Sequence, residues 1–206
     1  MMQPRWTDES AQEYLRGIIR IVNGQSRYQR PLARELIGKA FGRGVTEIWD
    51  MTCGLGVDAW TLCRLGYRVR SFERNPFLFD CLLKAKQEAD NDPSWRPISA
   101  RWTITLGDSF FYLAQETTPP EACYLDPMFV FTKNPTALPK KEMQALRFLL
   151  RHDEGNHFSV EEKLSQALDR VQKRVVLKWH RHLPGLKRSP NQIIDGNRIM
   201  FLIFFP

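Results

Sequence analysis

Two glycines and two acids stand in the segment 50–58 (DMTCGLGVD), directly after a predicted strand. Gly54 and Gly56 lack a Cβ, so the backbone of this turn can approach a ligand closely. The third glycine of a G-x-G-x-x-G fingerprint is absent, which disfavours a pyrophosphate ligand and therefore a nicotinamide dehydrogenase. Asp50 instead suits a ligand that carries a positive charge. A tight strand–helix turn without a ligand is the alternative.

Acidic residues also follow the next two predicted strands. Glu73 lies 23 residues after Asp50, an offset at which an acid can accept hydrogen bonds from both hydroxyls of a ribose. Asp108 and Ser109 end the third strand, where an acid or a hydroxyl could contact an adenine amino group. A solvated Glu73 paired with Arg74, and a plain turn after the third strand, are the alternatives. Because the carboxyl ends of parallel strands share one edge of a sheet, the three segments together predict an adenosine-binding site.

The segment 124–129 (YLDPMF) follows a fourth predicted strand and carries the most specific signal. It resembles the Asp/Asn-Pro-Pro-Tyr/Phe tetrapeptide of amino-group methyltransferases. An exocyclic amine of a base is a poor nucleophile because its lone pair is delocalised into the ring. Hydrogen bonds to the Asp126 carboxylate and a neighbouring carbonyl favour a pyramidal nitrogen, and an aromatic ring stacks on an extruded base. We therefore expect Asp126, Pro127 and Phe129 to be catalytic, the alternative being an Asp-Pro turn beside a core Phe.

Seven predicted strands must hold these segments, and most of them alternate with helices. The strands cover 45–50, 68–73, 101–106, 122–125, 174–178, 192–194 and 198–204. The helices cover 11–22, a segment that begins after Pro31 and ends at Phe41, and then 58–65, 76–89, 140–150 and 159–172. This alternation predicts an α/β fold, a mostly parallel sheet with helices on both faces. An Asp-Gly turn between the last two strands adds an antiparallel C-terminal hairpin.

The chain shows no internal repeat and no low-complexity linker, so its 206 residues predict a single domain. We expect residues 1–44 to form a helical N-terminal extension and residues 45–206 to form the catalytic core. The polar loop 23–30 is either a solvated connector or a lip over a cofactor or a nucleic acid.

Charge and composition narrow the class of protein. Lys and Arg outnumber Asp and Glu by 30 to 23, and a net charge of +7 favours phosphate-rich partners such as nucleic acid. The longest apolar run, 199–205, is too short to span a bilayer, so no membrane association is expected. A polar start without an export leader predicts a cytoplasmic protein. The four cysteines lack zinc and disulfide spacing, and His180 and His182 lack matching ligands, so we expect no metal.

Five segments together resemble the RsmJ-type family of methyltransferases. They are 50–58 (DMTCGLGVD), 73–76 (ERNP), 124–129 (YLDPMF), 140–143 (KKEM) and 173–178 (KRVVLK), within a resemblance that covers roughly residues 12–180. Members of this family use S-adenosylmethionine to methylate the 2-amino group of a guanine in small-subunit (16S) ribosomal RNA. The resemblance therefore implies a Rossmann-like class I methyltransferase with a seven-stranded sheet. It also implies S-adenosylmethionine as cofactor and small-subunit ribosomal RNA or the 30S particle as partner.

The cofactor site expected from the strand ends and from the family's motifs has ten residues. Asp50, Gly54 and Gly56 come from the residue types of the first turn. The family's motifs carry over to the others, which are Val57, Asp58, Glu73, Arg74, Asp108, Ser109 and Asp126.

Five basic residues are expected to contact RNA phosphates, because they follow the catalytic loop or the fifth strand on one side of the sheet. They are Lys133, Lys140, Lys141, Lys178 and Arg181. A solvated basic face is the alternative.

Two other functions fit the same residues. An enzyme of this fold could methylate an amino group on another base or on a small molecule, since the tetrapeptide suits both. A catalytically silent RNA-binding factor of ribosome assembly could also retain the fold.

Overall fold

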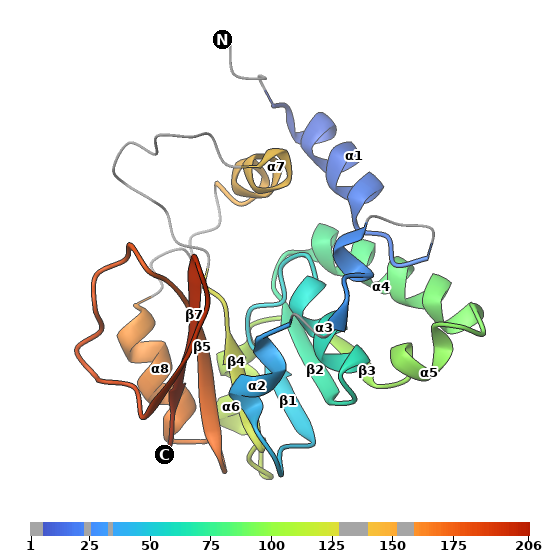
Figure 1. Cartoon of the computed structure of the whole chain (residues 1–206). Helices are drawn as coiled ribbons and strands as arrows, with labels where there is room; N and C mark the ends of the chain where they lie inside the picture. The colour runs from blue at the N-terminus through green and yellow to red at the C-terminus, as the bar shows by residue number, and fades with distance from the viewer. Residues whose placement is uncertain (1–5, 23–25, 33–34, 128–139, 152–158) are drawn as a thin grey trace.

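The computed structural model describes residues 6–22, 26–32, 35–127, 140–151 and 159–206 (Figure 1). Two predicted site residues, Phe129 and Lys133, lie outside these described residues. In the described part of the chain, no helix is long and apolar enough to cross a membrane.

Seven strands form one sheet in the order β3-β2-β1-β4-β5-β7-β6. Their bounds are β1 Glu47–Asp50, β2 Arg68–Glu73, β3 Trp102–Leu106, β4 Ala122–Leu125, β5 Arg174–His180, β6 Gln192–Asp195 and β7 Ile199–Phe204. The pairs along β3-β2-β1-β4-β5 are parallel, whereas β7 runs antiparallel to both β5 and β6. The predicted α/β fold, a mostly parallel sheet with an antiparallel C-terminal hairpin, is confirmed.

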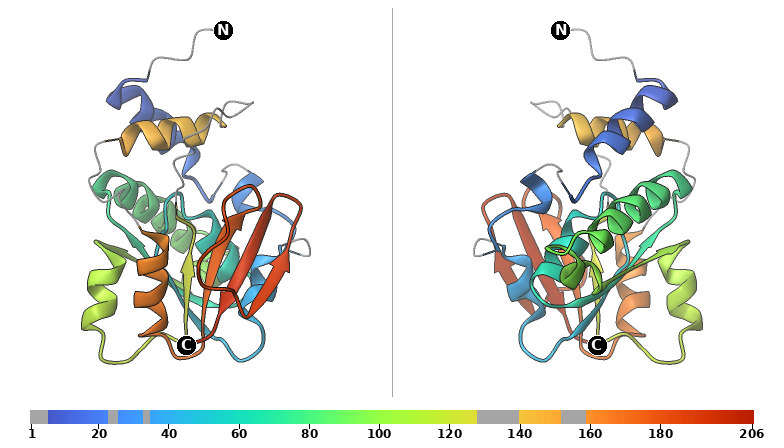
Figure 2. Two further views of the ribbon diagram at one scale, coloured as in Figure 1. Left: turned by 90° about the vertical axis from the view of Figure 1, so that its left-hand side faces the viewer. Right: turned by 90° about the vertical axis from the view of Figure 1, so that its right-hand side faces the viewer.

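Helices cover both faces of this sheet. They are α1 Asp8–Ile18, the 3-10 helix η1 Ser26–Tyr28, α2 Ile37–Phe41, α3 Val57–Arg64, α4 Pro76–Asn91, α5 Arg96–Ser99, α6 Ser109–Gln115, α7 Lys141–Leu149 and α8 Val160–Leu168. Helices α2, α3 and α4 pack on one face, and α6 and α8 pack on the other (Figure 2). Helices α1 and α7 lie against each other beyond the edge at which the parallel strands end (Figures 1 and 2).

The central strands are buried on both faces. Along β4, Ala122 and Tyr124 join the apolar cluster beneath α2, α3 and α4, while Cys123 and Leu125 join the cluster beneath α6 and α8. Successive side chains of a strand point to opposite faces, so a strand covered on both sides forms a continuous apolar run. That run is why the sequence predicts β4 with its correct bounds. All four cysteines are buried and have free thiols.

The N-terminal helices differ from their predicted boundaries. Helix α1 begins three residues earlier, because Thr7 caps it: the Thr7 hydroxyl accepts the Ser10 N–H at 3.1 Å. The Ser10 hydroxyl in turn accepts the Thr7 N–H at 2.9 Å, which completes a capping box. The helix ends at Ile18, four residues before the predicted end, and α2 begins only at Ile37. Apolar spacing alone misses the capped start of α1, continues past the end of α1 at Ile18, and places the start of α2 too early.

Strand β5 is longer than predicted and ends at His180. Its last residues pair with β7, where His180 lies opposite Ile199 and Lys178 lies opposite Phe201. On its other edge β5 pairs with β4, and Leu125 lies opposite Leu177. This register places the start of the 126–129 segment beside Lys178, which is the basis of the site described next.

Candidate active site

The carboxyl ends of β1, β2 and β4 meet where the strand order reverses, with β2 and β3 on one side of β1 and β4 on the other. Open α/β sheets bind their ligands at such a position. The backbone that follows β1 is hydrogen-bonded to both neighbours. The Met51 N–H donates to the Tyr124 carbonyl at 3.0 Å, and the Cys53 N–H donates to the Phe72 carbonyl at 3.2 Å. The loop is therefore held across the ends of three strands.

Glycine is needed at the two positions of this loop for different structural reasons. Both have positive φ values, +56° at Gly54 and +71° at Gly56, a conformation that glycine adopts without steric cost. A Cβ on Gly56 would lie 2.7 Å from Leu82 Cδ2 and 2.9 Å from the Trp102 ring, whereas the nearest atom to a Cβ on Gly54 is the Thr52 carbonyl oxygen at 3.9 Å. Close packing accounts for Gly56, and only Gly54 leaves open space that a ligand could fill.

Glu73 ends β2 and is 8% exposed, which excludes the solvated acid considered as an alternative. Its Oε2 accepts the Gly54 N–H at 3.0 Å, and its Oε1 accepts the Asn75 N–H at 2.9 Å. Burial raises the pKa of Glu73 to about 7, although these two N–H groups favour the ionised form. Each oxygen keeps a second lone pair, so the carboxylate can accept hydrogen bonds from two ligand hydroxyls.

Asp50, at the end of β1, is 1% exposed. It accepts the Thr52 N–H at 3.2 Å and lies 3.4 Å from the Ser71 hydroxyl. Burial raises the pKa of Asp50 to about 8, and the carboxylates of Asp58, Asp126 and Glu73 add to that increase. Four acids therefore act electrostatically on one another at this edge of the sheet. Such a cluster suits the positively charged sulfonium of S-adenosylmethionine.

A network of short hydrogen bonds joins the remaining two acids. Lys178 Nζ lies 2.7 Å from Asp58 Oδ2 and 2.8 Å from Asp126 Oδ2. The Tyr124 hydroxyl donates to the same Asp58 oxygen at 2.6 Å. The Asp126 N–H donates to the Thr52 hydroxyl at 2.7 Å. The Asp126 side chain is 32% exposed, so this carboxylate is held in place and still accessible to a ligand.

The pKa values of Asp58 and Asp126 are shifted in opposite directions. The donors Lys178 and Tyr124 hold the pKa of Asp58 below its usual range despite its desolvation. Desolvation raises the pKa of Asp126, and the charge of Lys178 opposes that increase. The two carboxylates raise the pKa of Lys178, so its ammonium stays charged.

Two other predicted cofactor residues, Asp108 and Ser109, form contacts that hold the local structure. The Asp108 carboxylate caps α6 by accepting the N–H groups of Phe110 and Phe111 at 2.8 and 3.1 Å. The buried Ser109 hydroxyl donates to the Met51 carbonyl at 2.9 Å, which ties α6 to the loop after β1. Val57 begins α3, and Arg74 is exposed directly after β2.

Three residues of the site were missed or assigned another role by the sequence analysis. Tyr124 stands two residues before Asp126, and residues at that spacing share one face of a strand, so the pattern could have indicated it. Thr52 is inside the 50–58 segment but drew no prediction. Lys178 was expected to contact RNA phosphate, and the structure instead places its ammonium between two carboxylates. Only the β4–β5 register could have shown this.

The predicted RNA contacts that the structure describes are otherwise exposed. Lys140 precedes α7, and the Lys141 ammonium lies 4.9 Å from the centre of the Tyr14 ring. Arg181 forms an ion pair with Asp195 and donates to the Gly196 carbonyl at 3.2 Å. Lys178 differs from these three residues, because its side chain is only 19% exposed and its ammonium is paired with two carboxylates.

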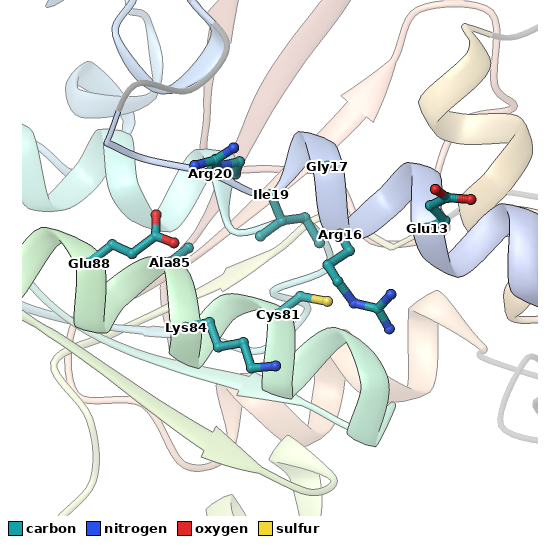
Figure 3. A pocket seen from close by; sticks show the side chains of 9 residues that line it. All are labelled: Glu13, Arg16, Gly17, Ile19, Arg20, Cys81, Lys84, Ala85 and Glu88. Atoms are coloured by element: carbon teal, nitrogen blue, oxygen red, sulfur yellow. The ribbon is translucent and has the colours of Figure 1, made fainter.

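A groove of about 420 Å³ separates the C-terminal half of α1 from α4 (Figure 3). Arg16, Arg20 and Lys84 line it together with two acids, Glu13 and Glu88, so its charge is mixed. None of the predicted site residues lines this groove, and the chemistry of the strand ends lies elsewhere.

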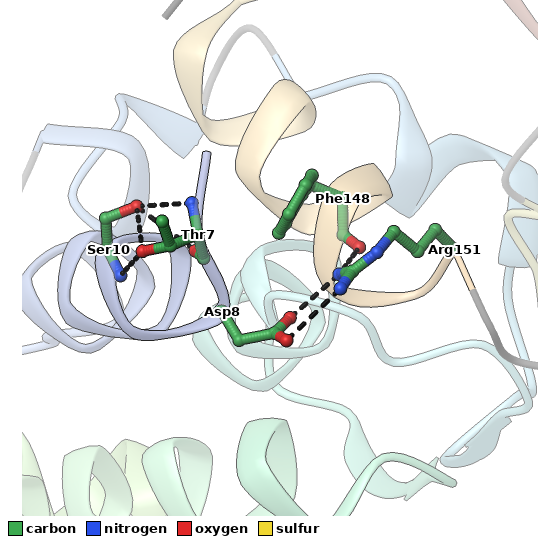
Figure 4. Close-up of polar contacts among 5 residues, drawn as sticks. All are labelled: Thr7, Asp8, Ser10, Phe148 and Arg151. Atoms are coloured by element: carbon green, nitrogen blue, oxygen red, sulfur yellow. Dashed lines mark hydrogen bonds and ion pairs between the residues drawn. The ribbon is translucent and has the colours of Figure 1, made fainter. Parts of the chain in front are cut away.

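Helix α7 is fixed against α1 at both of its ends. The Arg151 guanidinium donates to both oxygens of Asp8 at 2.8 and 3.1 Å and also to the Phe148 carbonyl (Figure 4). At the other end of α7, Lys141 lies over Tyr14. The basic start of α7 therefore has a defined place beyond the strand ends.

Comparisons with known proteins agree on one family. A family model described as a putative SAM-dependent methyltransferase matches residues 8–206. Ribosomal RNA small subunit methyltransferase J of Dechloromonas aromatica is 36% identical over 175 residues, which cover 82% of this chain and 69% of that protein. The protein of the same name from Chromobacterium violaceum is 31% identical and covers 89% of this chain and 73% of its own length. A SAM-dependent methyltransferase from Neisseria gonorrhoeae has a similar structure, with a TM-score of 0.65 at 27% identity over 84% of this chain and 71% of that one.

The two glycines provide a matched pair of substitutions. Gly54→Ala and Gly56→Ala each force a Cβ into the left-handed region, which costs about 1–2 kcal/mol. Gly56→Ala should lose about 1–3 kcal/mol more, because its Cβ would overlap Leu82 and Trp102. Gly54→Ala should instead lose affinity for S-adenosylmethionine beyond its loss of stability. Urea unfolding and titration calorimetry measure both quantities, and equal destabilisation by the two variants would contradict this assignment.

The raised pKa values of Glu73 and Asp50 predict that donor affinity rises with pH. Below about pH 7 both groups hold a proton in the free protein, and a cationic ligand must displace it. Affinity for S-adenosylmethionine should therefore increase between pH 6 and 8, by up to about tenfold per pH unit for each proton released. Calorimetry in buffers of different ionisation enthalpy detects the released protons.

S-adenosylhomocysteine, which lacks the sulfonium charge, is the matched ligand control and should show a weaker pH dependence. Glu73→Gln should lower the affinity by about 1.5–3 kcal/mol, the range for hydrogen bonds to a charged group. A folded wild-type protein whose affinity does not change from pH 6 to 8 would remove Glu73 and Asp50 from the donor site.

Proposed function

The chain belongs to the S-adenosylmethionine-dependent methyltransferase family, and from that premise we propose that its acceptor is the 2-amino group of a guanine in small-subunit (16S) ribosomal RNA. The curated relatives described above are named as methyltransferases of small-subunit ribosomal RNA. The observation that carries the proposal is the Asp126 carboxylate. It stands at the end of β4, is held through one oxygen by Lys178, and is accessible to a ligand.

The residues present fit a cationic donor with a ribose. Glu73 offers its two oxygens to the ribose hydroxyls, and Gly54 leaves room beside the turn. The acidic edge formed by Asp50, Asp58, Glu73 and Asp126 complements a positive charge. When bound, the donor supplies a methyl group already activated by the sulfonium, so the protein's main task is to position the acceptor.

Asp126 positions the acceptor through its second oxygen. Lys178 binds Oδ2, so Oδ1 is the oxygen that can accept a hydrogen bond from the guanine amine. The amine nitrogen would form its bond to the methyl carbon as the bond from that carbon to the donor's sulfur breaks. The nitrogen becomes positively charged in this step and then releases a proton to water. A carboxylate beside it stabilises that charge, and interactions of this type change rates by about 10²–10³. Pro127 is buried after Asp126 and stiffens the backbone there.

The proposal extends to the partner and the rest of the chain. We propose that Phe129 stacks on the extruded guanine and that Lys133, Lys140, Lys141 and Arg181 contact RNA phosphates, as the sequence analysis expects. We propose a cytoplasmic enzyme that uses no metal. The 206 residues would act as a single domain, with residues 1–44 as an extension of the core 45–206. Apolar residues of α1 share one cluster with β1 and β4, which supports a single unit.

One experiment separates this function from the two alternatives. Small subunits from a strain that lacks the gene are incubated with the protein and S-adenosylmethionine labelled in its methyl group, and modified nucleotides are mapped by mass. Label at one guanine supports the proposal. Label on another base or only on small molecules supports a different acceptor, and binding without label supports a silent assembly factor.

Asp126→Asn keeps the shape of the side chain and exchanges a charged acceptor for an amide that can present an N–H to the amine. We expect the rate of methyl transfer to fall by about 10²–10³ at saturating S-adenosylmethionine. Single-turnover methylation of undermethylated small subunits measures this rate. A folded Asp126→Asn protein within a few-fold of the wild-type rate would remove Asp126 from catalysis.

Salt dependence separates basic residues that contact RNA from those that do not. Lys140→Gln, Lys141→Gln and Arg181→Gln should each weaken RNA binding and flatten the plot of log K against log salt by roughly one unit. Lys178→Met is the matched control and should leave the slope unchanged, because that ammonium is bound to two carboxylates. A slope unchanged by the first three variants would mean that these residues are only a solvated face.

A further inference from the structure

Lys178 joins three elements that are far apart in the sequence. It lies in β5, 120 residues from Asp58 in α3 and 52 residues from Asp126 after β4. Its Nζ lies 2.7 Å from an oxygen of the first acid and 2.8 Å from an oxygen of the second. Both distances are those of charge-assisted hydrogen bonds, which are stronger than bonds between neutral groups.

The two carboxylates that Lys178 joins differ in how many side-chain donors hold them in place. Asp58 Oδ2 also accepts the Tyr124 hydroxyl at 2.6 Å, so Asp58 is anchored from two sides. Among the described residues, Lys178 donates the hydrogen bond that the Asp126 carboxylate accepts, and it does so to Oδ2. The orientation of Asp126 therefore depends on an ammonium whose own place is set by Asp58 and Tyr124.

We propose that Lys178 is a positioning residue for methyl transfer: by bridging Asp58 and Asp126, it holds Asp126 so that Oδ1 is presented to the acceptor amine. This inference rests on the proposed role of Asp126 as the group that binds the amine. It replaces the expected contact of Lys178 with RNA phosphate, since the Lys178 side chain is only 19% exposed.

Removal of the ammonium would leave two neighbouring carboxylates without the cation between them. Their mutual repulsion favours protonation of one and movement of the other. Asp58 keeps its bond from Tyr124, so Asp126 is the group that would take up the proton or turn away. A protonated Asp126 is a poorer acceptor for the amine and stabilises positive charge on nitrogen less.

The pKa of the Asp126 carboxyl depends on charged and titratable groups from four elements of the fold. Lys178 and His180 come from β5, and Asp58 comes from α3. Asp50 at the end of β1 and Tyr124 in β4 interact with it as well. Burial lowers the pKa of His180, so this ring is largely neutral at pH 7 and above, where Lys178 is the charged partner from β5.

The test compares wild type with Lys178→Met and Lys178→Arg. The ¹³C carboxyl resonance of Asp126, assigned by its loss in Asp126→Asn, reports the midpoint of its titration without any substrate. We expect Lys178→Met to raise this midpoint by about one pH unit or more. The acid limb of the kcat profile for methylation of undermethylated small subunits should move in the same direction. Lys178→Arg should restore much of both, while KM for S-adenosylmethionine changes only a few-fold.

A double variant keeps the test decisive if Lys178→Met does not fold. Lys178→Met with Asp58→Asn removes one carboxylate together with the cation. We expect it to fold, to keep a low kcat because Asp126 is no longer oriented, and to give an Asp126 midpoint above that of wild type, because the cation is absent.

The outcomes separate this inference from the proposed function. Absence of methyl transfer to guanine by the wild-type protein overturns the proposed function, whatever the titration shows. A shifted Asp126 midpoint with an unchanged kcat overturns the positioning role. Loss of thermal stability with neither the midpoint nor the pH profile changed reduces Lys178 to a structural ion pair and overturns the inference.

Discussion

The desolvation of four carboxylates at one edge of the sheet is the constraint on which this site depends. Asp50, Glu73 and Asp126 stand at or just after the ends of β1, β2 and β4, and Asp58 stands in the first turn of α3. The charges of the other three acids raise the pKa of Asp50, and the charge of Asp58 also raises the pKa of Asp126. An acid removed from water is unfavourable unless hydrogen bonds or a cation replace the water. Backbone N–H groups do so for Asp50 and Glu73, and Lys178 does so for the other two.

These different partners give the acids different properties. Asp58 is kept ionised by its two donors, while Asp50 and Glu73 have pKa values raised into the neutral range. Groups that exchange protons near neutral pH are concentrated at functional sites. Here they stand where a cationic donor is expected, and its charge would offset the repulsion among the acids. The cluster is therefore unfavourable in the free protein and complementary to its ligand.

Much of the fold could be predicted from local patterns. The bounds of β2 and β4 are both correct, and β4 is the continuous apolar run that is typical of a buried strand in a covered sheet. The N-terminal helices were predicted with wrong bounds, because apolar spacing shows neither the cap at Thr7, which begins α1 three residues earlier, nor the end of α1 at Ile18. The short α5 and α6 were missed because one to two turns provide too little periodicity to detect.

For the site, the residue types that follow each strand could be predicted from the chain alone, namely the glycine turn, Glu73 and the segment with Asp126. A strand end is a local feature, because the residues that form the following turn are adjacent in the sequence. How those residues are used depends on long-range packing. Leu82 and Trp102 leave no room for a Cβ at Gly56, and Lys178 bridges two acids instead of standing at the surface. The contacts of Lys178 depend on the parallel register of β4 with β5 and on the placement of α3. They join residues 52 and 120 positions apart, a separation that no local pattern of the chain encodes.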